Sequence, residues 1–141
     1  MVLLGLDIGK KRIGVAKSDE LNMFSHAVGH FMRGTDDELI NKINELIEMY
    51  HPQKIIIGLP KKMDGTEAVA SSAIQELINT IKEYIPIGIE TWDERLTTKE
   101  AFRYMHDSSL SGLKKKNKVD ALAAQIMLQN YIDYNKARYN E

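Results

Sequence analysis

The sequence contains no cysteine, and its N-terminus has no long apolar run. The lack of cysteine excludes disulfide bonds, thiol catalysis and thiolate metal sites. Because the N-terminus has neither the apolar core of a signal peptide nor a membrane span, we expect a cytoplasmic protein with no membrane partner. The net charge of −1 excludes a globally basic nucleic-acid binder, although it allows local basic clusters.

The length of the chain limits its organisation. With 141 residues it can bury one good core but is too short for two domains of ordinary size. No internal repeat, low-complexity tract or interdomain linker is present. We therefore expect a single domain over residues 1–141, with a polar C-terminal tail from about residue 134.

Hydrophobic periodicity predicts the order of the elements. Three strand patterns come first and form a meander, over residues 2–8, 13–16 and 24–32. A capping box at Thr35 then begins a helix that stops at His51-Pro52. The rest of the chain is predicted to contain a strand over 54–60, a helix over about 67–81, a strand ending near Thr91, a short helix capped by Thr97, a lysine-rich loop and a final helix from about 119.

The predicted order is βββαβαβαα, which resembles that of the RNase H-like fold. It implies an α/β protein with a mixed five-stranded sheet and helices on both faces. Crossover helices make the later strands parallel to the first, so their carboxyl ends meet at one edge, where ligands usually bind.

Three carboxylates are placed at the ends of core elements. Asp7 interrupts the apolar first strand, where an unpaired charge costs several kcal/mol unless metal or hydrogen bonds compensate. Glu94 follows the last predicted strand, and Asp120 lies at the predicted start of the final helix. Three such acids could form a divalent-metal site. Two alternatives stay open: Asp93 could replace Glu94, and Asp120 could be an ordinary helix cap.

Basic residues lie next to these acids in three groups. They comprise Lys10, Lys11 and Arg12 after the first strand, Lys61 and Lys62 after the fourth, and Lys114, Lys115, Lys116 and Lys118 before the final helix. They could follow a phosphate backbone, or they could simply form a solvated surface. Arg95 and Thr97 could contact the scissile phosphate, although Thr97 is equally explained as a helix cap.

Four motifs, in order along the chain, closely resemble the YqgF/RuvX family. They are Gly5-Leu6-Asp7-Ile8-Gly9 with Arg12-Ile13-Gly14-Val15-Ala16, Gly58-Leu59-Pro60 with Met63-Asp64-Gly65-Thr66, Trp92-Asp93-Glu94-Arg95-Leu96-Thr97-Thr98, and Val119-Asp120-Ala121-Leu122-Ala123-Ala124 with Leu128-Gln129. The resemblance implies a metal-dependent nuclease, associated in this family with maturation of the 5′ end of pre-16S rRNA. It implies Asp7, Glu94 and Asp120 as catalytic ligands of two Mg²⁺ or Mn²⁺ ions, which roughly 3.5–4 Å apart can support phosphodiester hydrolysis.

The expected partner is a nucleic acid. Pre-rRNA is favoured, with ribosomal precursor particles as a further candidate, and the substrate-binding candidates are Lys11, Arg12, Lys62, Arg95, Thr97, Lys115 and Lys116. Resolution of Holliday junctions is the alternative activity, and a nonenzymatic RNA- or ribosome-binding module is the alternative class. A sugar-kinase-like ATPase is disfavoured, because such enzymes hold nucleotide between two domains. The absence of an evident spare apolar stripe predicts a monomer or weak homodimer.

Overall fold

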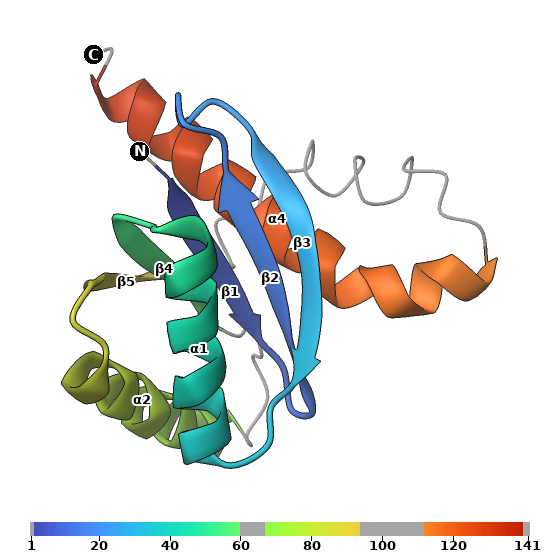
Figure 1. Cartoon of the computed structure of the whole chain (residues 1–141), viewed down its shortest axis with the longest axis vertical. Coiled ribbons are helices and arrows are strands. Elements are labelled where there is room, and N and C mark those ends of the chain that lie inside the picture. Colours follow the sequence, from blue (N-terminus) through green and yellow to red (C-terminus); the bar gives the residue numbers. More distant parts are fainter. Residues whose placement is uncertain (1, 60–66, 94–111, 140–141) are drawn as a thin grey trace.

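The computed structural model describes the backbone of residues 2–59, 67–93 and 112–139, and the side chains of residues 2–59, 72–93 and 120–136. Within this part, a five-stranded sheet is covered by helices on both faces (Figure 1). The strands are β1 (Leu3–Ile8), β2 (Arg12–Ser18), β3 (Ser25–Met32), β4 (Lys54–Leu59) and β5 (Gly88–Asp93). The helices are α1 (Asp36–Tyr50), α2 (Glu67–Tyr84) and α4 (Gly112–Tyr139).

The sheet has the strand order β3-β2-β1-β4-β5. The first three strands form the predicted antiparallel meander, and β4 and β5 add parallel to β1. The carboxyl ends of β1, β4 and β5 therefore lie at the same edge, as the crossover rule predicts. The mixed α/β sheet expected from the sequence is confirmed.

The alternation of side chains along the strands produces two cores. On one face, strand residues such as Leu4, Leu6 and Ile57 pack with α1 and α2. On the other face, Ala16, Ile56 and Trp92 are in a cluster with α4 residues. Because successive strand residues point to opposite faces, each face can carry its own kind of side chain. Figure 1 shows α1 and α2 on one side of the sheet and α4 crossing the other.

Helix α1 has the predicted termini. The Thr35 hydroxyl accepts a hydrogen bond from the Glu38 amide at 3.2 Å, and the Glu38 side chain accepts one from the Thr35 amide at 3.4 Å. His51 ends the helix in the left-handed conformation, with its amide donating to the Ile47 carbonyl at 2.8 Å. The capping box and the stop before Pro52 are both confirmed.

Helix α4 is longer than the sequence pattern predicts. It begins at Gly112, so the lysine-rich segment forms its first turns instead of a loop. The straight side chains of lysine are good helix formers, and a run of like charges does not by itself break a helix. Asp120 consequently lies more than two turns inside the helix, and its interpretation as an N-terminal cap is wrong. The helix also reaches Tyr139, beyond the start of the expected polar tail.

One smaller difference concerns the end of the sheet. Strand β5 continues to Asp93, two residues past the predicted end near Thr91. The short helix predicted from Thr97 lies outside the described residues. Among the helices of the described part, none has a segment long and apolar enough to cross a membrane.

Candidate active site at the carboxyl ends of the parallel strands

Asp7 lies one residue before the end of β1, on the face covered by α4. Its neighbours Leu6 and Ile8 belong to the core on the α1 and α2 side, so Asp7 points the opposite way. Its side chain is half-buried, in keeping with a position at the rim of the α4 core. The structure thus places this carboxylate at the edge where the parallel strands end.

Gly14 brings α4 close to Asp7. In the antiparallel ladder Gly14 is the partner of Asp7, so the two residues present the same face of the sheet to α4. A Cβ atom built on Gly14 would lie 1.9 Å from the backbone oxygen of Asp120. The backbone of α4 therefore occupies the space that any side chain at Gly14 would need. This contact places the backbone of Asp120 over Gly14, the cross-strand neighbour of Asp7.

Gly5 permits a second close approach of α4. A Cβ atom on Gly5 would lie 3.1 Å from Leu128 Cβ, on the same face as Asp7. Gly5 and Gly14 both lie in the first of the family-like motifs, but no function was predicted for them from the sequence. A signal was present, since glycine between apolar residues of a strand often marks close approach of another backbone.

Arg12 forms an ion pair with Asp120. Its Nε atom lies 3.1 Å from Asp120 Oδ2, and the two side chains are 43% and 28% exposed. Arg12 begins β2, two residues before Gly14, so its side chain emerges on the α4 face. Arg12, a predicted phosphate-binding residue, is therefore paired with Asp120, a predicted metal ligand.

The turn before Arg12 carries further positive charge. Lys10 and Lys11 are exposed there. Arg33, which was not predicted from the sequence, lies at the same edge. Its Nη1 atom donates to the Gly9 carbonyl at 3.3 Å and its amide donates to the Lys11 carbonyl at 2.9 Å. This contact from the end of β3 could not be read from a local motif. The edge beside Asp7 is thus rimmed by cations.

The remaining predicted site residues are only partly placed. Glu94, Lys62, Arg95 and Thr97 lie outside the described residues, and Lys115 and Lys116 lie in α4 at positions whose side chains are not described. Within the described ranges, no three acidic or histidine side chains are grouped closely enough to hold a metal ion. Of the predicted site residues, the structure pairs Arg12 with Asp120 and places Asp7 beside Gly14 on the same face of the sheet.

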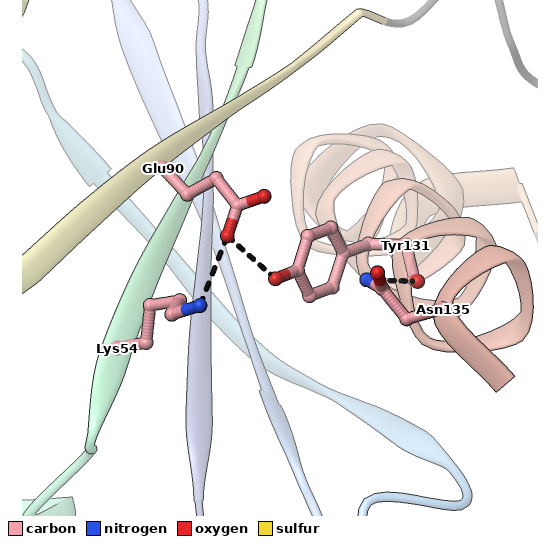
Figure 2. A network of polar contacts seen from close by, with 4 residues as sticks. All are labelled: Lys54, Glu90, Tyr131 and Asn135. Carbon is pink, nitrogen blue, oxygen red and sulfur yellow. Dashed lines mark hydrogen bonds and ion pairs between the residues drawn. The ribbon is translucent and has the colours of Figure 1, made fainter. Parts of the chain in front are cut away.

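A polar network holds α4 at the opposite end of the parallel strands (Figure 2). The carboxylate of Glu90 accepts hydrogen bonds from the Tyr131 hydroxyl at 2.7 Å and from Lys54 Nζ at 3.0 Å. Burial, followed by the hydrogen bond to Glu90, raises the pKa of Tyr131, and the hydrogen bond to Glu90 raises the pKa of Lys54. Since Lys54 begins β4, the network is an anchor of α4 away from Asp7.

Hydrogen bonds also hold α4 against the start of β3. Ser25 donates through its hydroxyl to the Gln125 carbonyl at 2.6 Å and through its amide to Gln129 Oε1 at 2.9 Å. Gln129 in turn donates to the Met23 carbonyl at 3.1 Å. Together with the Glu90 network, these bonds fix the register of α4, and with it the position of Asp120.

Two solved junction resolvases share this arrangement. The chain is similar to Thermus thermophilus RuvC in complex with a Holliday junction substrate, with a TM-score of 0.60, 13% identity, and 97% and 96% of the two chains covered. A fowlpox virus resolvase with Holliday junction DNA gives a TM-score of 0.56 at 12% identity, covering 96% and 99%. These likenesses define the fold as RNase H-like, of the kind found in resolvases.

Sequence comparison defines the family. The family model described as "RuvX: Holliday junction resolvase" matches residues 1–134. A protein of Halothermothrix orenii is 37% identical over 134 residues, covering 95% of this chain and 96% of its own. One of Clostridium acetobutylicum is 41% identical over 133 residues, covering 94% and 98%. Both carry the name "Putative pre-16S rRNA nuclease". The chain belongs to the RuvX family, as its motifs predict.

Proposed function

We propose that this protein is a divalent-metal-dependent nuclease that hydrolyses phosphodiester bonds in the 5′-end processing of pre-16S rRNA. The observation that carries the proposal is the convergence of Asp7 and Asp120 on one face of the sheet, through the contact of α4 with Gly14. The names of the two relatives support RNA as the substrate. Ribosomal precursor particles are the proposed setting.

The residues present suit a hard divalent cation. Asp7 and Asp120 supply carboxylate oxygens, which Mg²⁺ and Mn²⁺ prefer. The Asp120 carboxylate already faces a cation, the Arg12 guanidinium, at 3.1 Å. When bound, two such ions would stabilise charge on the attacking and leaving oxygens of the phosphodiester. Asp7 and Asp120 would hold them, while the cationic rim of Lys11 and Arg12 would orient the phosphate backbone.

The alternation of β5 favours Glu94 over Asp93 as the third ligand. Ile89 packs with the core on the α1 and α2 side. Asp93 is four residues further along the strand and therefore points to that same side. Trp92 belongs to the α4 core, on the same face as Asp7. Glu94 comes two residues after Trp92, so it would face the same side as Asp7 if the alternation of side chains continued past Asp93. We propose Lys62, Arg95, Thr97, Lys115 and Lys116 as further contacts to the phosphate backbone of the substrate.

Replacing Asp7 by asparagine tests the proposal. The change removes ligand charge with little change of shape, so cleavage of pre-16S rRNA in Mg²⁺ or Mn²⁺ should fall by at least about a thousandfold. Relief of repulsion between metal-free carboxylates should leave the melting temperature unchanged or higher. Glu48→Gln makes the same chemical change on the exposed surface of α1 and should cleave normally. Wild-type cleavage by Asp7→Asn would refute the site.

The same assay separates the enzyme from a nonenzymatic module. Purified wild-type protein should cleave the RNA when Mg²⁺ or Mn²⁺ is added and stop when the metal is chelated. A protein that binds the RNA tightly but never cuts it under any of these conditions would instead be a binding module.

Holliday junction resolution is the second candidate, because the family description names it. Symmetric incision of a four-way junction requires two active sites related by a two-fold axis, and therefore a stable dimer. We predict instead a monomer or weak dimer at micromolar concentration that cleaves pre-ribosomal RNA in preference to junction DNA. Sedimentation with and without a four-way junction checks this. A tight dimer that binds one junction and nicks opposing strands symmetrically would favour the resolvase.

A further inference from the structure

Arg12 has two candidate partners, the carboxylate of Asp120 and a phosphate of the substrate. As a predicted phosphate-binding residue it should reach the nucleic acid, yet its Nε atom lies 3.1 Å from Asp120 Oδ2. Asp120 is in turn a proposed metal ligand, and a carboxylate that binds a divalent cation has less charge left for a guanidinium. The side chain of Arg12 therefore competes with the metal for the same oxygen.

The surroundings of Arg12 allow the side chain to change partner while the backbone stays fixed. Its carbonyl accepts a hydrogen bond from the Gly9 amide at 2.9 Å, and the residue is paired with Met32 of β3. The side chain itself is 43% exposed, and its carboxylate partner is 28% exposed. An ion pair of this exposure shifts an equilibrium by no more than about fivefold, so it is easily exchanged.

From this geometry we propose that Arg12 is a latch that couples metal binding to nucleic-acid binding. In the metal-free protein Arg12 neutralises Asp120. When Asp120 takes up the metal, the guanidinium is released at the rim of the site and binds a phosphate of the substrate. The planar fork of arginine suits both partners, since it matches carboxylate and phosphate oxygens equally well.

This inference rests on the proposed metal-dependent nuclease function and adds an order of events to it. The metal binds more weakly than the carboxylates alone would allow, because it must displace Arg12. The nucleic acid binds more tightly once the metal is present, because the arginine is then free. By linkage, nucleic acid must raise the affinity for metal by the same factor.

The first test measures Mn²⁺ binding by calorimetry without nucleic acid. Arg12→Gln removes the competitor and should bind Mn²⁺ about two- to fivefold more tightly than the wild type. Lys10→Gln removes the same charge from the neighbouring exposed turn position and serves as the matched control, with a clearly smaller change. Arg12→Lys keeps the charge and should stay close to the wild type.

The second test measures the binding of a short phosphorothioate RNA, which resists cleavage, with Mn²⁺ and with EDTA. Mn²⁺ should strengthen RNA binding more in the wild type than in Arg12→Gln, with Arg12→Lys between them. Lys10→Gln should weaken binding in both conditions by the same factor, because an uncoupled phosphate contact does not depend on the metal.

The outcomes distinguish the latch from the underlying function. If Arg12→Gln and Lys10→Gln change Mn²⁺ affinity equally, or if Arg12→Gln lowers it, the latch is overturned while the metal site stands. If wild-type Mn²⁺ binding is not weakened by Asp7→Asn, the proposed metal site itself fails. Circular dichroism of each variant confirms that the fold is retained.

Discussion

The two faces of the sheet are built from different kinds of residue. In the described part of the chain, every buried member of the cluster beneath α1 and α2 is leucine, isoleucine or valine. The cluster beneath α4 also contains branched aliphatic residues, but it adds two alanines, Met127, Trp92 and Tyr131 to them. Branched aliphatic side chains fill space efficiently and carry no polar atom, so the first face chiefly supplies stability.

The α4 face has smaller residues, which let the helix lie close to the sheet. Glycines at 5 and 14 let the helix lie directly on β1 and β2, and alanines extend the close contact. Directional hydrogen bonds, from Ser25 to the Gln125 carbonyl and from Tyr131 to Glu90, then hold the helix in one register. One face of this small domain is thus built for burial, while the other is built to place a few polar groups.

The largest expected effect comes from two adjacent isoleucines of β4. Ile57 and Ile56 are both fully buried, but Ile57 faces α1 and α2 whereas Ile56 faces α4. Replacing either by alanine leaves a cavity and should lower the free energy of unfolding by about 2–5 kcal/mol. Denaturant titration measures this loss.

The two variants, Ile57→Ala and Ile56→Ala, test what each face contributes to activity. Under conditions where both variants are folded, Ile57→Ala should retain cleavage per folded molecule, whereas Ile56→Ala should lose part of it because α4 and Asp120 shift. Equal cleavage by both variants would show that the two faces do not differ in function.

A smaller loss of stability, with a large loss of activity, is expected for Gly14→Ala. The added methyl would meet the Asp120 carbonyl at 1.9 Å, so α4 must move, at a cost of about 1–3 kcal/mol. A misplacement of about 1 Å can lower catalysis by about a hundredfold. Gly88→Ala on β5 is the matched control, because nothing lies within 4 Å of a Cβ there.

Tryptophan fluorescence provides a reading of this movement that does not depend on activity. Trp92 is the sole tryptophan of the chain, and its ring lies edge-on to Tyr131 of α4 with the centroids 5.6 Å apart. Displacement of α4 in Gly14→Ala should change its emission, and Gly88→Ala should leave it unchanged. If Gly14→Ala has native emission and native activity, the contact is unimportant for placing Asp120.

Local patterns were sufficient to predict much of the fold. The capping box at Thr35 and the alternation of apolar residues depend on neighbours within a few positions, and these elements agree with the structure. The lysine run, expected as a loop, forms the first turns of α4, because lysine has a high helix propensity. Intrinsic propensity was the better guide there.

The contacts that position the candidate site could not be predicted in this way. The Arg12–Asp120 ion pair and the approach of Asp120 to Gly14 each join residues more than a hundred positions apart. The local pattern of apolar residues contains no information about contacts between such distant positions. The motifs indicated which residues matter, and the packing of α4 shows how two of them meet.

The smallest effect should come from the anchor at the far end of α4. Tyr131→Phe removes the hydrogen bond to Glu90 and should cost about 0.5–1.5 kcal/mol at neutral pH, with cleavage nearly unchanged. Because the pKa values of Tyr131 and Lys54 are raised in the folded protein, the folded state holds these protons more tightly than the unfolded state. The associated stability is complete below pH ~10, near the unfolded pKa values, and is lost as the pH rises through the higher folded values. The stability difference between wild type and Tyr131→Phe, measured by urea titration, should therefore shrink above pH ~10. A difference that stays constant or grows with pH would mean that the Glu90 contact does not hold α4, and that the stability of this face comes from apolar packing alone.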